Sequence, residues 1–235
     1  MQPILTIQEI YFLIAFNESF NPRLITPEFL HSSVIVPEDW ELARSPQLQH
    51  HLSEISFTNG GSITACPNSL EFRQIIRADL KDSLPILEVA QKFVRVLKNV
   101  PYKSVSINPR SFFTFNVEDE TVARRYITSK FMSCGPWQTI GDSYPETTLE
   151  LNFTLNDRPF SITIADVCIQ ISTRSPQPAL LFSGEFHNEI VGQTAIERIR
   201  CLCEILSHWK EDFQTYRQIL QEYFIPNADI AHKTS

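Results

Sequence analysis

Alternating apolar and polar positions predict short β-strands along much of the chain. Residues 7–16, rich in Ile, Phe and Tyr, are apolar on both phases of the alternation, which predicts a central strand covered on both faces. Apolar residues also alternate with polar ones on both sides of an Asn-Gly-Gly triplet at 59–61. Since Asn and Gly tolerate the positive φ of a tight turn, this segment predicts a hairpin, and Leu70 and Phe72 predict a third strand.

A second group of strands is predicted between residues 149 and 190. Four apolar residues alternate with polar ones before a turn-forming Asn-Asp pair: Leu149, Leu151, Phe153 and Leu155. The strand after this turn changes phase, because Ile162 and Ile164 share one face whereas Val167, Ile169 and Ile171 share the other. A β-bulge at residues 165–166 accounts for the change, since a bulge inserts one extra residue into a strand.

Spacings of three and four residues predict three helices. Residues 84–97 carry one apolar stripe, and residues 118–132 begin with acidic side chains that suit the positive end of a helix dipole. A longer final helix over residues 194–224 begins with the Thr-Ala-Ile-Glu sequence of a capping box. Its apolar positions recur alternately three and four residues apart: Ile199, Leu202, Leu206, Trp209, Phe213, Tyr216, Leu220 and Tyr223.

These elements predict an α+β fold with a largely antiparallel sheet of roughly six to eight strands and two or three helices on one face. We expect one domain over residues 1–225 and a frayed tail over residues 226–235, which have little to bury. Residues 55–97 and 149–223 share a plan of three short strands followed by a helix. This plan suggests two βββα halves, divided at residues 135 and 136, with a groove at their junction as the natural ligand-binding place.

The charge of the chain argues against a nucleic-acid ligand. It has 20 basic and 27 acidic residues, a formal net charge of −7, whereas non-specific nucleic-acid binding depends on Lys and Arg replacing counterions. The apolar run at residues 10–16 is too short to cross a bilayer, and Glu9 precedes it while Arg23 is the first basic residue, unlike a secretory signal. Five cysteines without paired spacing predict reduced thiols. We therefore expect a cytoplasmic protein that binds neither nucleic acid nor a membrane.

One group of ionisable residues has the spacing of a metal or acid-base site. Glu185, His187 and Glu189 point to the same face of a strand, because side chains alternate with period two. Two carboxylates and an imidazole suit a divalent metal or proton transfer. The sequence shows no fourth ligand nearby, and polar residues opposite an apolar strand face are also what a solvated sheet requires. The solvated face is therefore the favoured interpretation, and we expect no bound cofactor.

Two single residues are further candidates. Asp166 lies at the predicted bulge, where a side chain is either re-aimed at a site or accepts hydrogen bonds from freed backbone N–H groups. The second role is the favoured one. Trp137 lies in a loop that contains glycine, where its ring either stacks on a ligand or closes an edge of the core.

The apolar series of the final helix leaves two interpretations open. Packing on the chain's own sheet is favoured over a coiled-coil seam, because the aromatic rings would crowd a seam. The second half of the helix carries residues that combine an apolar body with a polar end, a type enriched at interfaces. Our hypothesis is that this half contributes to a homodimer or partner surface through Trp209, Phe213, Tyr216 and Leu220.

The motifs that identify common enzyme classes are missing from the sequence. It contains no GxSxG, GxxxxGK[ST], GxGxxG or HExxH segment, and no catalytic residue is assigned. We expect a non-catalytic interaction or assembly protein that acts as a homo-oligomer through a sheet edge or its C-terminal helix. The alternative is a small-molecule-binding protein or a metal-assisted hydrolase that uses the groove between the two halves.

Overall fold

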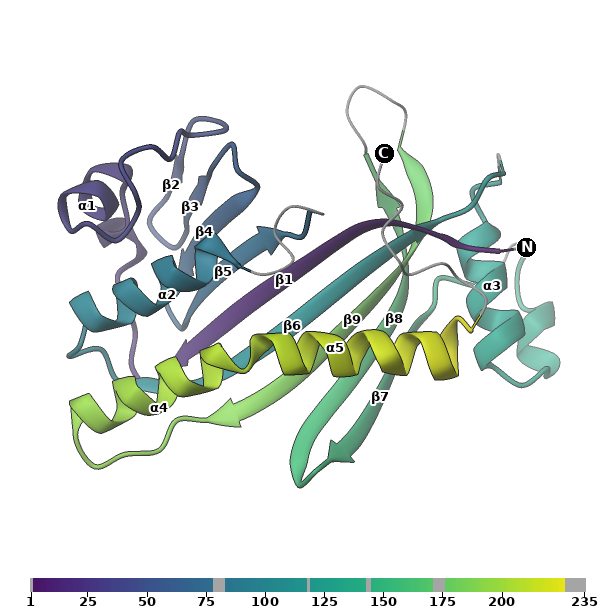
Figure 1. The fold of residues 1–235 in the computed structure, drawn as a ribbon. Helices are drawn as coiled ribbons and strands as arrows, with labels where there is room; N and C mark the ends of the chain where they lie inside the picture. Colours follow the sequence, from purple (N-terminus) through teal and green to yellow (C-terminus); the bar gives the residue numbers. More distant parts are fainter. Residues whose placement is uncertain (1, 78–82, 118, 143–144, 171–175, 227–235) are drawn as a thin grey trace.

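A single nine-stranded antiparallel sheet forms the centre of the molecule (Figure 1). The computed structural model describes residues 2–77, 83–117, 119–142, 145–170 and 176–226. The strand order is β2-β3-β4-β5-β1-β6-β9-β8-β7, so the predicted α+β class is confirmed, with more strands than expected. The strands are β1 (Ile4–Phe16), β2 (Gln47–Leu48), β3 (Ser53–Ser56), β4 (Gly61–Cys66), β5 (Ser69–Ile75), β6 (Tyr102–Thr114), β7 (Thr148–Leu155), β8 (Arg158–Ile169) and β9 (Gln177–Glu189).

The main helices lie on one face of this sheet: in Figure 1, α4 and α5 follow one another in a line across it, and α2 lies beside α4. The helical segments are η1 (Pro22–Leu24), α1 (Pro27–Ser32), α2 (Pro85–Val96), α3 (Val122–Phe131), η3 (Pro136–Thr139), α4 (Ala195–Ser207), α5 (Trp209–Ile219) and η4 (Leu220–Phe224). The capping box predicted for the last helix is present at Thr194 and Glu197. No helix within the described residues is long and apolar enough to cross a membrane.

Eight of the nine strands follow two copies of one topological plan, and β2 is additional. In the first, a long strand, β1, precedes the β3-β4-β5 meander and α2; in the second, β6 precedes the β7-β8-β9 meander and α4. The two units meet where β1 and β6 pair antiparallel. The second unit therefore begins at β6, upstream of the boundary suggested at residues 135 and 136, because each meander is preceded by its own long strand. The junction is a paired ladder along nearly the whole of β1, with register shifts between Leu5 and Ile7 and between Ala15 and Phe16.

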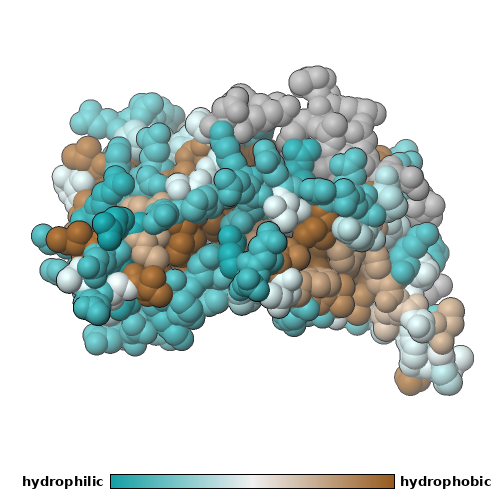
Figure 2. Space-filling model, turned by 60° about the horizontal axis from the view of Figure 1, so that its bottom comes forward, coloured by the Kyte–Doolittle hydropathy of each residue, from teal (hydrophilic) through white to brown (hydrophobic). Residues whose placement is uncertain are grey.

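Hydrophobic side chains reach the surface over part of the molecule. Figure 2 shows them in both halves of the view, between hydrophilic stretches, with the broader group in the right half. The exposed members in β7 are Leu151 and Phe153. The helices therefore cover the centre of the sheet and leave this margin open.

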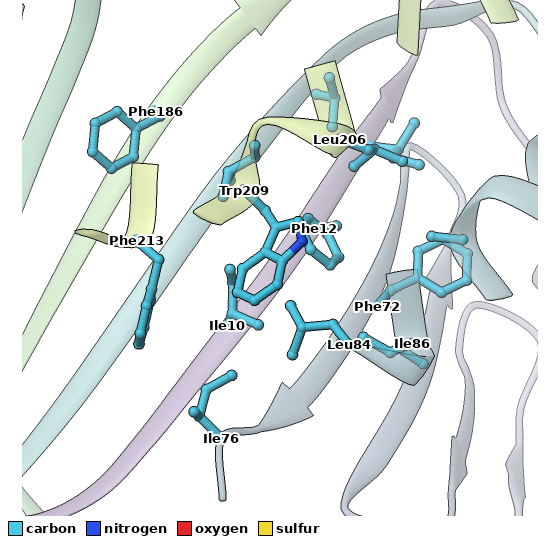
Figure 3. Close-up of a cluster of buried hydrophobic side chains, with 14 of the residues drawn as sticks. Ile10, Phe12, Phe72, Ile76, Leu84, Ile86, Phe186, Leu206, Trp209 and Phe213 are labelled. Atoms are coloured by element: carbon cyan, nitrogen blue, oxygen red, sulfur yellow. The ribbon is translucent and has the colours of Figure 1, made fainter. Parts of the chain in front are cut away.

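The interior between the sheet and the helices is one continuous hydrophobic cluster (Figure 3). Ile10 and Phe12 of β1 and Phe72 of β5 meet Leu84 and the helix α2 there. The rings of Phe72 and Phe93 pack edge to face with centroids 5.5 Å apart. Residues two apart on each strand supply this layer, as the alternation predicts.

From the sequence, Pro109 is expected to interrupt a strand that contains Val105 and Ile107, because proline cannot donate to a ladder, but the interruption does not occur. β6 continues through Pro109, which pairs with Ile10 of β1, while the β6–β9 register omits this position and resumes at Arg110. Proline cannot donate to a ladder, and the partner strand carries Gly184 nearby, whose Cα hydrogen faces the proline ring: a Cβ there would lie 3.3 Å from Pro109 Cγ. The glycine gives the ring room inside a central strand.

The predicted bulge at residues 165–166 is also absent. β8 keeps an unbroken register with β9 from Phe160 to Ile169. Ile164 and Asp166 therefore share the face toward the helices, whereas Val167 and Ile169 lie on the other face. The apolar pattern seems to change phase because the polar residue Asp166 occupies a position on the helix side. Asp166 forms an ion pair there with Arg124 of α3. Ile171, which completed the predicted pattern, lies outside the described residues.

The predicted final helix is divided in two at His208, which has φ −80° and ψ 5°. Its apolar series packs on the chain's own sheet, as favoured above. Trp209, Phe213, Tyr216 and Leu220 are 6%, 8%, 0% and 0% exposed and belong to the hydrophobic cluster. These four side chains are part of the interior of the single chain and do not form a surface.

Candidate functional site

The face of the sheet turned away from the helices is polar at its centre. Cross-strand partners on β5, β1, β6 and β9 place their side chains on this face because residues two apart share a side. The residues are Glu71, Arg73, Glu9, Tyr11, Ser104, Ser106, Arg110, Ser183, Glu185, His187 and Glu189. β1 is the central strand, as expected, and both of its faces are covered there: on the second face Glu9 and Tyr11 are 3% and 8% exposed, among polar neighbours.

A fixed network of charged and aromatic groups lies in the middle of this polar face. The Tyr11 hydroxyl donates to Glu9 Oε2 at 2.7 Å, and Arg73 forms an ion pair with Glu9. The Arg110 guanidinium lies 4.0 Å from the centroid of the Tyr11 ring. Burial, followed by the charge of Glu9, raises the pKa of Tyr11 to about 12, so this hydroxyl remains a donor at neutral pH.

The predicted trio is brought together with a serine that the sequence did not indicate. The Ser106 hydroxyl donates to Glu185 Oε1 at 2.8 Å and lies 3.1 Å from His187 Nδ1. His187 Nε2 lies 3.2 Å from Glu189 Oε1. Ser106 is 81 residues from His187 in sequence, and only the pairing of β6 with β9 places them side by side.

The geometry of the trio does not favour the metal hypothesis. Within the described part of the chain, no group of three or more His, Cys, Asp or Glu side chains is placed to hold a metal ion. The three side chains follow one another along β9: His187 hydrogen-bonds to Glu189 and to Ser106, and Glu185 accepts from Ser106. Three surface pockets, of about 580, 420 and 210 Å³, are lined by other residues.

Asp166 and Trp137 have local structural contacts. Asp166 Oδ2 accepts from Arg124 Nε at 2.8 Å, and its Oδ1 accepts from the backbone N–H of Thr147 at 3.2 Å. Asp166 therefore links α3 and the residue before β7 to β8. It accepts a backbone hydrogen bond, as in the favoured interpretation, but from Thr147 and not from a group freed by a bulge. Trp137 lies half-buried in η3 and packs against Gly135, where a Cβ would come within 2.9 Å of its ring.

β7 is the terminal strand of the sheet, and no described strand pairs with its outer edge (Figure 1). It is eight residues long and contains no proline, lysine or arginine. Leu151 and Phe153, on the face toward the helices, are 39% and 42% exposed. A long edge strand with exposed apolar side chains is a template for another strand.

The opposite edge of the sheet is protected. β2 has only two residues, Gln47–Leu48, and Pro46 precedes it. Short edge strands and adjacent prolines are devices that prevent edge-to-edge association. The two ends of the same sheet therefore differ, and β7 is the open one.

A row of aromatic rings connects the open edge to the core. Phe153 stacks on Phe160 with centroids 6.0 Å apart, and Phe160 meets Phe186 at 4.6 Å. Arg158 lies 5.3 Å from the Phe186 ring and binds Asp212 of α5 at 2.9 Å. Burial raises the pKa of Asp212, and the hydrogen bond and charge of Arg158 offset part of this effect. The β7–β8 hairpin is thus linked to α5 through Arg158.

Sequence reasoning identified the β7 strand but not that it forms an edge. The alternation of its four apolar residues was visible, whereas the strand order depends on contacts between distant segments. The absence of proline and basic residues from the strand is the signal that, in combination with the proline before β2, distinguishes the two edges.

The chain matches no known family model, and no curated protein matches its sequence.

Proposed function

We propose that this chain is a non-catalytic interaction or assembly protein whose working surface is the outer edge of β7. The observation that carries the proposal is the contrast between the two edges: β2 is short and follows a proline, whereas β7 offers eight residues and half-exposed apolar side chains. Addition of a strand to such an edge is a recurrent mode of protein recognition. Backbone hydrogen bonds supply affinity, and alternate side chains supply specificity.

The turn after β7 indicates which backbone groups are free. Asn156 and Asp157 both have positive φ, 49° and 62°, and Leu155 faces Arg158 across this two-residue turn. The first and fourth residues of such a turn share a hydrogen bond, and hydrogen-bonded positions alternate along an antiparallel ladder. The odd-numbered residues of β7 therefore bond to β8, and the N–H and C=O groups of Thr148, Glu150, Asn152 and Thr154 point outward.

A peptide that copies residues 148–155, labelled and extended with lysines for solubility, is expected to bind the chain saturably in a fluorescence anisotropy titration. Asn152→Pro is expected to weaken that binding by roughly tenfold or more, about 1.4 kcal/mol. The substitution removes an outward donor and leaves the β7–β8 ladder intact, and proline is tolerated on an edge strand when its nitrogen faces solvent.

Leu151→Pro is the matched control for this experiment. It removes a donor that β7 uses toward β8, so it is expected to lower the thermal stability of the chain, whereas Asn152→Pro is expected to leave it nearly unchanged. Equal peptide binding by the wild-type chain and a folded Asn152→Pro variant would mean that the outer edge of β7 is not the binding surface.

A second candidate function is supported by the hydrogen-bonded series from Ser106 through His187 to Glu189, which has the order of a hydroxyl nucleophile, a base and a carboxylate. In that case the polar sheet face would bind a small ester or amide. Hydrolysis of an activated ester such as p-nitrophenyl acetate is then expected to fall to the uncatalysed rate in both Ser106→Ala and His187→Gln. A rate that neither substitution changes rules this candidate out.

A further inference from the structure

We infer that the strand added to β7 is β7 of a second copy of this chain, paired antiparallel across a two-fold axis that passes through Asn152. This inference rests on the proposed function of the β7 edge and names its partner. The two sheets would then continue as one across the axis, with the helices of both copies on the same side.

The directions of the free backbone groups restrict the possible registers. Only even-numbered residues of β7 point N–H and C=O outward, so an even residue must face an even residue of the second copy. A two-fold axis through Asn152 satisfies this rule: Asn152 faces its own counterpart, and Glu150 faces Thr154 in both halves of the pair. These three positions form the hydrogen-bonded pairs of the new ladder.

The apolar side chains select one register among those that the backbone permits. With the axis at Asn152, Leu151 faces Phe153 and Leu149 faces Leu155, so all four apolar residues of β7 gain an apolar partner. A shift of the axis to Leu151 would place Leu155 opposite Thr147. In this register the odd-numbered residues form the non-hydrogen-bonded pairs, which bring side chains closest together. Leu151 of each copy would therefore cover Phe153 of the other copy.

The charges of β7 agree with the same arrangement. Glu150 is the only charged residue of the strand and meets a threonine in this register. An axis through Glu150 would instead bring two carboxylates face to face, which is unfavourable. A strand that matches its own sequence in backbone direction, apolar pairing and charge is suited to an identical partner, and this favours a second copy over an unrelated peptide.

The size of the contact indicates how stable the dimer is. A standard protein interface buries roughly 1,600 Å² in total, and the pairing of one short strand with two exposed apolar side chains per copy lies at the low end of that range. We therefore expect a reversible dimer with a dissociation constant on the order of micromolar.

Disulfide trapping of Asn152→Cys tests the register directly. In this arrangement the two introduced thiols face each other at a Cα separation of roughly 5.5 Å, which a disulfide spans. Mild oxidation followed by non-reducing electrophoresis is expected to give roughly tenfold more covalent dimer than Thr148→Cys. Thr148 lies on the same exposed strand but is about eight residues from its counterpart in this register. The wild-type chain measures the background from Cys134 and Cys168, which are exposed.

Sedimentation of the wild-type chain and Asn152→Pro completes the test. The wild-type chain is expected to show a concentration-dependent dimer, and the proline variant a monomer. Equal trapping at positions 148 and 152, or trapping that is stronger for Leu151→Cys, would overturn the register. If the wild-type chain stays monomeric yet binds the β7 peptide, the dimer is wrong and the proposed function of the β7 edge stands. If the chain neither dimerises nor binds the peptide, both the dimer and the proposed function are wrong.

Discussion

Replacement of Trp209 by alanine is expected to lower the free energy of unfolding by about 3–5 kcal/mol, the usual cost of truncating a buried aromatic residue. Trp209 is 6% exposed and lies in the cluster of Figure 3, where its ring centroid is 6.4 Å from that of Phe213. Its removal leaves a cavity between α5, the sheet and α2. Denaturant titration followed by circular dichroism measures the loss.

Tyr223 provides the control, because it belongs to the same series of apolar positions but is 74% exposed. Tyr223→Ala is expected to change the free energy of unfolding by no more than about 0.5 kcal/mol. If Trp209→Ala left stability unchanged and instead altered only the association of the chain, the packing of α5 on the sheet described here would be wrong.

Gly184→Ala is expected to lower the free energy of unfolding by about 2 kcal/mol, as typical of overpacked cores. An added Cβ would lie 2.8 Å from Cδ2 of Tyr216, a ring that is fully buried and whose hydroxyl donates to the carbonyl of Phe182 at 2.8 Å. Neither the ring nor the proline beside it can withdraw without breaking other contacts. Thermal or denaturant unfolding gives the measurement.

A double-mutant cycle separates this clash from any general effect of the substitution on β9. In a Tyr216→Leu background the smaller side chain leaves space above residue 184, so Gly184→Ala should cost markedly less than it does in the wild-type chain. An equal cost in both backgrounds would show that Tyr216 is not the group that requires glycine at this position.

Local signals were sufficient to predict most of the elements. The Asn-Gly-Gly hairpin, the alternation of β7 and the capping box of α4 depend on residues within a few positions of one another, and all three are present. The one-sided arrangement of the helices also follows, because each helix has a single apolar stripe to bury.

The errors arose where a distant residue determines the local structure. Pro109 is accommodated because Gly184 lies beside it on β9, and Asp166 faces the helices because Arg124 of α3 binds it. Neither partner is near in sequence, so the rules for isolated strands predicted a break and a bulge. Both are cases in which tertiary packing decides against a local preference.

The candidate sites were predictable only in part. The period of β9 places Glu185, His187 and Glu189 on one face, as the structure has them, but Ser106 joins them through strand pairing alone. Similarly, the three- and four-residue spacing of the last helix indicated burial for Trp209 without indicating whether the chain's own sheet or another molecule would cover it.

The pairing of β1 with β6 has a consequence for synthesis of the chain. β1 is synthesised well before β6, one of its two neighbours in the sheet, which begins at Tyr102, roughly a hundred residues later. Until β6 is synthesised, one edge of the apolar strand β1 has no partner strand. Because such long-range contacts slow folding and expose unpaired strands, the nascent first unit is the stage at which this protein most needs protection from aggregation.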